Sequence, residues 1–289
     1  MELFLHLVFS GIATGAIYAS LALALVMIFN STNHLNFAQG EMALLSTYFA
    51  WSLIAAGLSY WAAFALTVVA SFAFGVFLER VLIRSFKNAP PMTLVVVFVA
   101  LLLGLNALSG WIWGYVLKEF PSPVRKFSSG TSMIGAHDLF VLAVTLVLLG
   151  ILYIFFTFTK LGLAMKASAQ NPASARLVGI RVGWMLALGW GMASALGAVA
   201  GILVAPIVYL DPNMMLNVLL YAFASAMLGG LSSPPGAVAG GLIFGVLENL
   251  VGEYLIGHEL KLTFALVVVV GVLLVRPAGL FGKFVVKRV

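Results

Sequence analysis

Long apolar runs constrain this chain more than any other feature of its sequence. Soluble domains average about 45–50% apolar and about 25% charged residues, whereas 63% of these 289 residues are hydrophobic and only 8% are charged. A transmembrane helix needs about 20 mostly apolar residues. Nine runs qualify, at about 3–29, 37–57, 59–79, 92–117, 138–159, 184–209, 215–231, 236–256 and 260–275. We therefore predict an all-α polytopic membrane protein with about eight or nine transmembrane helices, and exclude a soluble enzyme, a nucleic-acid binder and a disordered chain.

The basic residues predict the topology. Eleven of the 15 Lys and Arg residues fall on one side of the predicted spans: Arg80, Arg84, Lys87, Lys160, Lys166, Arg176, Arg181, Arg276, Lys283, Lys287 and Arg288. The positive-inside rule places that side in the cytoplasm. We expect a cytoplasmic C-terminus and, with nine spans, an N-terminus outside. The other four are Lys118, Arg125, Lys126 and Lys261, and we expect Lys261 to snorkel to the membrane interface.

No linker or second domain is evident, so residues 1–289 are predicted to form a single transmembrane domain. Its N-terminus has no basic n-region and does not resemble a cleavable signal peptide. Several glycines lie four residues apart, which predicts close helix–helix contacts. They are the pairs Gly11 and Gly15, Gly197 and Gly201, Gly236 and Gly240, and Gly241 and Gly245.

The sequence contains none of the common catalytic, phosphate-binding or metal-binding motifs. There are no cysteines, no phosphate-binding GxxxxGK[ST] loop, no HExxH or GxSxG motif and no metal-spaced histidine cluster. We therefore expect no catalytic residue, no metal and no cofactor. Any ATP hydrolysis must come from a partner.

A polar interruption at residues 30–41 separates the first two apolar runs. It carries no Lys or Arg. Irregular backbone at membrane depth is tolerated where it is buried in protein or lines a cavity, and transporters often place substrate sites at such broken helices. Residues 36–41, with Asn36, Gln39, Gly40 and Glu41, are our candidates for a translocation pathway. The alternative is an ordinary polar turn at the cytoplasmic surface.

Carboxylates inside apolar sequence form a second group of candidates, because an intramembrane charge is costly. Glu248 is the deepest of them, beside Asn249. It could line an aqueous translocation path, or it could make a structural hydrogen bond or ion pair with another span. Glu79 lies beside Arg80 at a predicted helix end, which favours a structural role.

The segment 160–183 is the longest predicted cytoplasmic loop. Asn171 and Pro172 form a helix start, with Asn as the N-cap and Pro in the first position, and Gly179 should end a short helix that runs to about Val178. This helix could dock in a groove of a soluble partner or lie on the lipid surface. Further along, Pro234, Pro235 and Gly236 predict a tight turn between two spans.

Several motifs together resemble the permease subunits of branched-chain amino-acid ABC importers, the LivH/LivM permease family. The resemblance extends over most of the chain. It rests on Gly15–Ala19, Asn36–Glu41, Glu79–Val81, Ala175–Ile180, Leu228–Ala237 and Arg276–Gly282. Asn36–Glu41 reads NFAQGE and is similar to the family's NFAHGE motif, with Gln39 in place of the usual His.

The resemblance implies a permease in a bacterial-type inner membrane. Its expected partners are two ATP-binding subunits, a second homologous permease, an extracytoplasmic solute-binding protein and membrane lipid, with no nucleic acid. The residues implied in ATPase coupling are Asn171, Pro172, Arg176, Leu177, Gly179 and Ile180. Related permeases carry urea, amides or other small polar solutes, so these stay open as substrates. A third possibility is an ion-coupled secondary transporter that acts alone, with Glu248 as its ion site.

Overall fold

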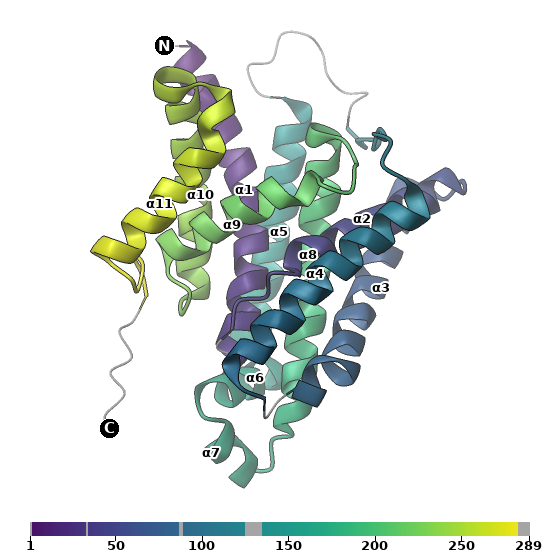
Figure 1. Ribbon diagram of the computed structural model, residues 1–289, viewed down its shortest axis with the longest axis vertical. Helices are drawn as coiled ribbons and strands as arrows, with labels where there is room; N and C mark the ends of the chain where they lie inside the picture. Colours follow the sequence, from purple (N-terminus) through teal and green to yellow (C-terminus); the bar gives the residue numbers. More distant parts are fainter. Residues whose placement is uncertain (1, 33, 87–88, 125–134, 283–289) are drawn as a thin grey trace. The chain divides into compact units, whose positions relative to one another are not determined.

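The chain folds almost entirely into helices in a computed structural model (Figure 1). The structure describes residues 2–32, 34–86, 89–124 and 135–282. The topology prediction also used six basic residues outside these ranges, namely Lys87, Arg125, Lys126, Lys283, Lys287 and Arg288.

All nine predicted apolar runs are helical, which confirms the all-α fold class. Their bounds are α1 Glu2–Thr32, α2 Gln39–Ala55, α3 Tyr60–Val81, α4 Pro91–Trp113, α5 Ala136–Phe158, α8 Val182–Val208, α9 Met214–Gly229, α10 Pro234–Val251 and α11 Lys261–Val275. Among the described residues, six helical segments are long and apolar enough to cross a membrane: those that contain α1, α3, α4, α5, α8 and α10. Helices α2, α9 and α11 are shorter, at 17, 16 and 15 residues. A count of eight or nine spans therefore stays a prediction.

The segment 160–183 contains more helix than expected. A short helix, α7 Pro172–Leu177, is confirmed, but residues 160–170 also form a helix, α6 Lys160–Gln170. The Thr159 side chain caps α6 by accepting a hydrogen bond from the Gly162 N–H at 3.0 Å. Gly162, Met165 and Ser168 recur every three residues and are buried, because α6 packs against α8. The loop prediction was wrong here because only one narrow face of this helix is covered.

The Pro-Pro-Gly segment was also misread as the turn itself. The turn between α9 and α10 lies just before it, and Pro234 and Pro235 occupy the first positions of α10. The Ser233 hydroxyl accepts a hydrogen bond from the Gly236 N–H at 3.1 Å. Pro is tolerated there because the first N–H groups of a helix have no intrahelical partner.

The chain divides into two compact units, each built from segments far apart in sequence. One unit comprises Met1–Val26, Ser122–Ala143 and Leu216–Val289, and is called the terminal unit below. The other comprises Met27–Pro121 and Val144–Met215, and is called the central unit. In the central unit, α8 packs against α2 and α3, and α2 packs against α4. In the terminal unit, α10 packs against α11.

Glycine pairs allow close approach of helices, as predicted. In the terminal unit, a Cβ added to Gly11 would lie 2.8 Å from the Val246 Cα, and one added to Gly15 would lie 2.8 Å from the Gly241 carbonyl oxygen. In the central unit, a Cβ on Gly201 would overlap Thr47. The backbones of α1 and α10 can therefore touch only because these residues lack side chains.

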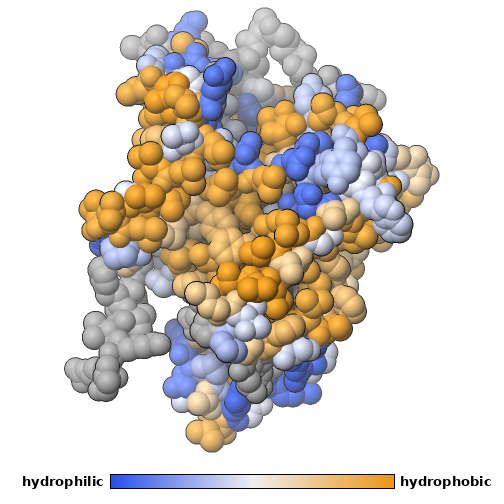
Figure 2. Space-filling view, in the orientation of Figure 1, coloured by the Kyte–Doolittle hydropathy of each residue, from blue (hydrophilic) through white to orange (hydrophobic). Residues whose placement is uncertain are grey.

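Apolar side chains cover most of the visible face (Figure 2). Hydrophilic side chains gather at its lower edge, where Figure 1 shows α6 and α7. An apolar outer surface of this kind is typical of a chain surrounded by lipid, with its polar connections facing water.

Candidate functional site

The break between α1 and α2 is held together by the side chain of Asn36. Its Oδ1 accepts a hydrogen bond from the Ala38 N–H at 3.1 Å, and its Nδ2 donates one to Gln39 Oε1 at 3.3 Å. Helix α1 ends at Thr32, and the chain turns at Phe37 and Ala38 before α2 begins at Gln39. Asn36 is fully buried, whereas His34, Leu35 and Phe37 are half-buried.

Gln39 joins this turn to the middle of α8. Its Nε2 donates a hydrogen bond to the Ala193 carbonyl oxygen at 2.9 Å. Gly197 leaves room for it, since a Cβ there would lie 2.8 Å from Nε2. Gln39 is fully buried and Gly40 is buried beside it.

Glu41 lies one residue further on and is 1% exposed. Asn106 of α4 donates to Glu41 Oε2 at 3.3 Å and also contacts the Pro212 carbonyl oxygen at 2.6 Å. No basic side chain within the described ranges forms an ion pair with Glu41. The central unit therefore gathers Asn36, Gln39, Gly40 and Glu41 at the start of α2, with buried polar groups that are satisfied mainly by amides.

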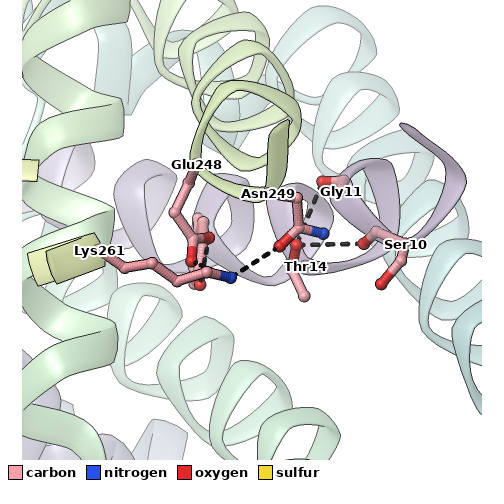
Figure 3. A network of polar contacts seen from close by, with 7 residues as sticks. Ser10, Gly11, Thr14, Glu248, Asn249 and Lys261 are labelled. Carbon is pink, nitrogen blue, oxygen red and sulfur yellow. Dashed lines mark hydrogen bonds and ion pairs between the residues drawn. The ribbon is translucent and has the colours of Figure 1, made fainter. Parts of the chain in front are cut away.

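Glu248 has a different environment, in the terminal unit (Figure 3). Its Oε1 lies 3.0 Å from Lys261 Nζ, and its Oε2 accepts a hydrogen bond from the Tyr18 hydroxyl at 3.1 Å. Lys261 also donates to Asn249 Oδ1 at 3.1 Å. The carboxylate is 3% exposed. Of the two roles left open for Glu248, the structure provides the ion pair with a neighbouring helix.

The Lys261 amine is turned to Glu248, and its side chain is only 17% exposed. That this side chain reaches the membrane interface stays a prediction. The lysine stem lies over Gly252, where a Cβ would come within 3.1 Å of Lys261 Cγ. Gly252 begins a π-helical segment, Gly252–Ile256, so a local change of helix winding and a missing side chain together make room for the lysine.

Helix α7 presents the residues expected to couple to a partner. The Asn171 Oδ1 accepts a hydrogen bond from the Ser174 N–H at 3.0 Å, and Pro172 follows in the first helical position. Gly179 ends the helix with a φ of 83°, a backbone conformation that favours glycine. The Leu177 side chain is 88% exposed and Arg176 is also exposed.

The hydrogen bond from the Ile180 N–H to the Ala175 carbonyl oxygen, at 3.0 Å, closes the end of α7. Ile180 itself is half-buried. Of the residues assigned to coupling, Leu177 therefore has the large apolar side chain that is exposed, and Pro172 is exposed beside it.

Two polar residues were missed by reasoning from the sequence, namely Asn106 and Tyr18. Asn106 is an isolated amide within the apolar helix α4, and such residues often form hydrogen bonds between helices. That signal could have identified it as a partner for a buried carboxylate. Tyr18 sits within an apolar run and carries no such signal.

The long apolar helices are those of a multi-pass membrane protein. The family model described as "Branched-chain amino acid transport system / permease component" matches residues 7–273. The chain belongs to this family.

Curated relatives match it along nearly their whole length. The high-affinity branched-chain amino acid transport system permease protein LivH of Salmonella typhimurium is 29% identical over 99% of this chain and 98% of its own. BraD of Pseudomonas aeruginosa, named as the same kind of permease, is 28% identical with the same coverage. A probable branched-chain amino acid transport permease protein LivH of Methanocaldococcus jannaschii is 30% identical over 91% of this chain and 87% of its own.

Proposed function

We propose that the chain is the transmembrane permease subunit of an ATP-driven importer for branched-chain or related small amino acids, located in the inner membrane. The observation that carries the proposal is the match to permeases of this name along almost the whole chain. The test is uptake in proteoliposomes that hold the permease with its partner subunits. ATP-dependent accumulation of leucine supports the proposal, whereas uptake of urea or amides without leucine would contradict the substrate.

The energy source in this proposal is external to the chain. Two ATP-binding subunits bind on the side of α7, a second homologous permease completes the pathway, and a solute-binding protein delivers the amino acid from outside. The whole chain acts as one transmembrane domain, with α2, α9 and α11 as short membrane-embedded helices beside the six long ones. The C-terminus lies in the cytoplasm, on the side that carries most of the Lys and Arg residues.

Helix α7 serves as the coupling helix. It is short, capped at both ends and exposes Leu177, as expected of a helix that inserts into a groove. Replacing Leu177 by Asp should reduce copurification of the ATPase subunits while the membrane domain stays folded, and Leu177→Met is the matched control. Equal copurification with both variants would mean that α7 docks elsewhere, for example on lipid.

The start of α2 forms part of the pathway in the proposal. Seventeen residues of α-helix span about 26 Å at 1.5 Å per residue, less than the roughly 30 Å of a hydrocarbon core. In the proposal its first turn lies at membrane depth, together with Asn36, Gln39, Gly40 and Glu41. During transport, Gln39 and Glu41 exchange their present partners for substrate or water. Glu248 contributes a fixed charge that is compensated by Lys261.

Alanine at Asn36 and Gln39 tests the pathway assignment. Both variants should lower the maximal transport rate by about tenfold or more, because each loses a buried hydrogen-bonding group. Ser46→Ala is a useful control, since Ser46 is also buried in α2 and bonds to the Met42 carbonyl oxygen. Full transport by folded Asn36→Ala and Gln39→Ala variants would exclude this set.

A secondary transporter that acts alone is disfavoured by the surroundings of Glu248. A carboxylate 3.0 Å from a lysine amine is already neutralised, so it is poorly suited to take up a coupling cation. The discriminating measurement is whether uptake needs ATP and partner subunits.

A further inference from the structure

A pocket of about 350 Å³ opens in the central unit, between the ends of α3 and α7 and the starts of α4 and α8. Its lining combines one carboxylate, two guanidinium groups and an apolar wall. We propose that this pocket binds a free, zwitterionic α-amino acid with an apolar side chain. The inference rests on the proposed function only for its side of the membrane, which is the side of α7.

Two buried polar groups in the pocket have hydrogen-bonding capacity to spare. Glu79 is 4% exposed, and its Oε2 has no hydrogen-bond partner but forms a long ion pair with Arg80 Nε at 3.9 Å. Trp190 is fully buried, yet its indole N–H has no acceptor. Buried polar groups are nearly always paired. These two atoms are covered in the present conformation, so a ligand in the pocket would reach them through a small rotation of the two side chains.

The two guanidinium groups lie at the open side. Arg84 and Arg176 both line the pocket and both are exposed. Gly183 lets Arg84 approach the start of α8, because a Cβ there would lie 3.4 Å from Arg84 Nη2. The planar guanidinium group is well shaped to bind a carboxylate through two parallel hydrogen bonds.

Apart from Thr32 and Trp190, the rest of the lining is apolar. Leu94 and Phe98 come from α4, and Leu186 from α8. The rings of Phe98 and Trp190 stack with their centroids 6.0 Å apart. The carboxylate of Glu79 therefore fits a ligand ammonium group, the arginines fit a carboxylate, and this wall fits an aliphatic side chain.

The buried carboxylate of Glu79 disfavours a purely anionic ligand. A phosphatidylglycerol headgroup would satisfy the arginines but would bring its charge near a second, buried carboxylate. A phosphatidylethanolamine headgroup carries both an ammonium group and an anion, so it shares the chemistry of the amino acid. The experiment below separates these two sources.

Equilibrium binding of radiolabelled L-leucine to the full chain in phosphatidylcholine nanodiscs tests the proposal. Wild-type protein should bind leucine, and Glu79→Gln and Arg84→Gln should each weaken binding by about tenfold or more, as expected for a lost charged hydrogen bond. Arg181→Gln is the matched control, because Arg181 is an exposed arginine of the same segment outside the pocket. Its affinity should equal the wild-type value.

Competition by leucine analogues that lack one charged group gives a second readout. This readout does not require the Glu79 variants to fold. Isoamylamine lacks the carboxylate and 4-methylpentanoate lacks the ammonium group, so each should compete at least about tenfold less well than leucine. Trp190→Phe keeps the ring but removes the N–H, and should weaken binding in a protein that elutes as wild type does.

Three results would overturn the proposal. They are no leucine binding in phosphatidylcholine, leucine binding that none of the pocket variants alters, and displacement of leucine by phosphatidylethanolamine with no dependence on the amine and acid analogues. These results are distinct from failure of the proposed function. Transport by the complete system would persist if only the pocket were misassigned, and a chain without partners could still bind leucine here.

Discussion

Replacing Glu248 by Gln should destabilise the protein, because it leaves Lys261 as an uncompensated charge in an apolar setting. The two charged atoms lie 3.0 Å apart, which corresponds to an attraction of about 5–6 kcal/mol at an effective dielectric constant of about 20. Desolvation offsets part of it, so removal of one partner should cost about 3–4 kcal/mol. Lys261→Met should cost a similar amount, since Glu248 is 3% exposed.

The double variant Glu248→Gln, Lys261→Met separates a structural pair from a chemically required carboxylate. It removes both charges, keeps an oxygen for the Tyr18 hydroxyl and keeps an apolar stem over Gly252. Its destabilisation should be smaller than the sum of the single variants by about 2–3 kcal/mol. Transport of the reconstituted system should be largely retained.

The assay is reversible unfolding in mixed detergent micelles, as a double-mutant cycle, with transport measured on the same variants. Additive effects of the two substitutions would show that the side chains do not interact. A double variant that is folded but inactive would refute the structural reading, and would make Glu248 a group that the transport step requires.

Three further predictions concern backbone contacts and the coupling helix. Gly241→Val should lower the unfolding free energy by about 1–3 kcal/mol through overpacking, whereas Gly271→Val, with no neighbour near its Cβ position, should change it by less than about 0.5 kcal/mol; equal effects would contradict the close helix contact. Gly252→Ala should displace the Lys261 stem and destabilise the protein, by less than Lys261→Met because the flexible lysine can shift; a neutral result in the same micelle assay would show that the lysine has another place to lie. Asn171→Ala should destabilise α7 by about 1 kcal/mol and increase proteolysis there, while Asn171→Asp should preserve the cap.

The sequence predicted local features well because their causes are local. The nine apolar helices follow from the length of the runs, and α7 follows from Asn171 and Gly179, whose capping roles depend on a few neighbouring residues. Helix α6 was missed because it is short and carries two lysines within a predicted cytoplasmic loop, and its covered face shows only once α8 packs against it. The same cap rule that located α7 would have placed Pro234 at a helix start if Ser233 had been read as the cap.

Run length and helix capping could not predict contacts between residues that are distant in sequence. Lys261 was expected to reach the interface because the last apolar run, 260–275, is short, and nothing in the sequence marks Glu248 as its partner. Glu248 lies on α10 and Lys261 on α11, so their contact depends on how the π-helical segment turns the chain. The orphaned N–H of Trp190 is likewise visible only in three dimensions.

Copurification from native membranes tests the central claim most directly. The chain would be tagged at its C-terminus, extracted in mild detergent, and assayed for bound subunits and ATP hydrolysis. We predict stoichiometric ATP-binding subunits, a second permease subunit, and ATP hydrolysis that drives leucine uptake after reconstitution. A stable oligomer of this chain alone that transports without ATP would contradict the account.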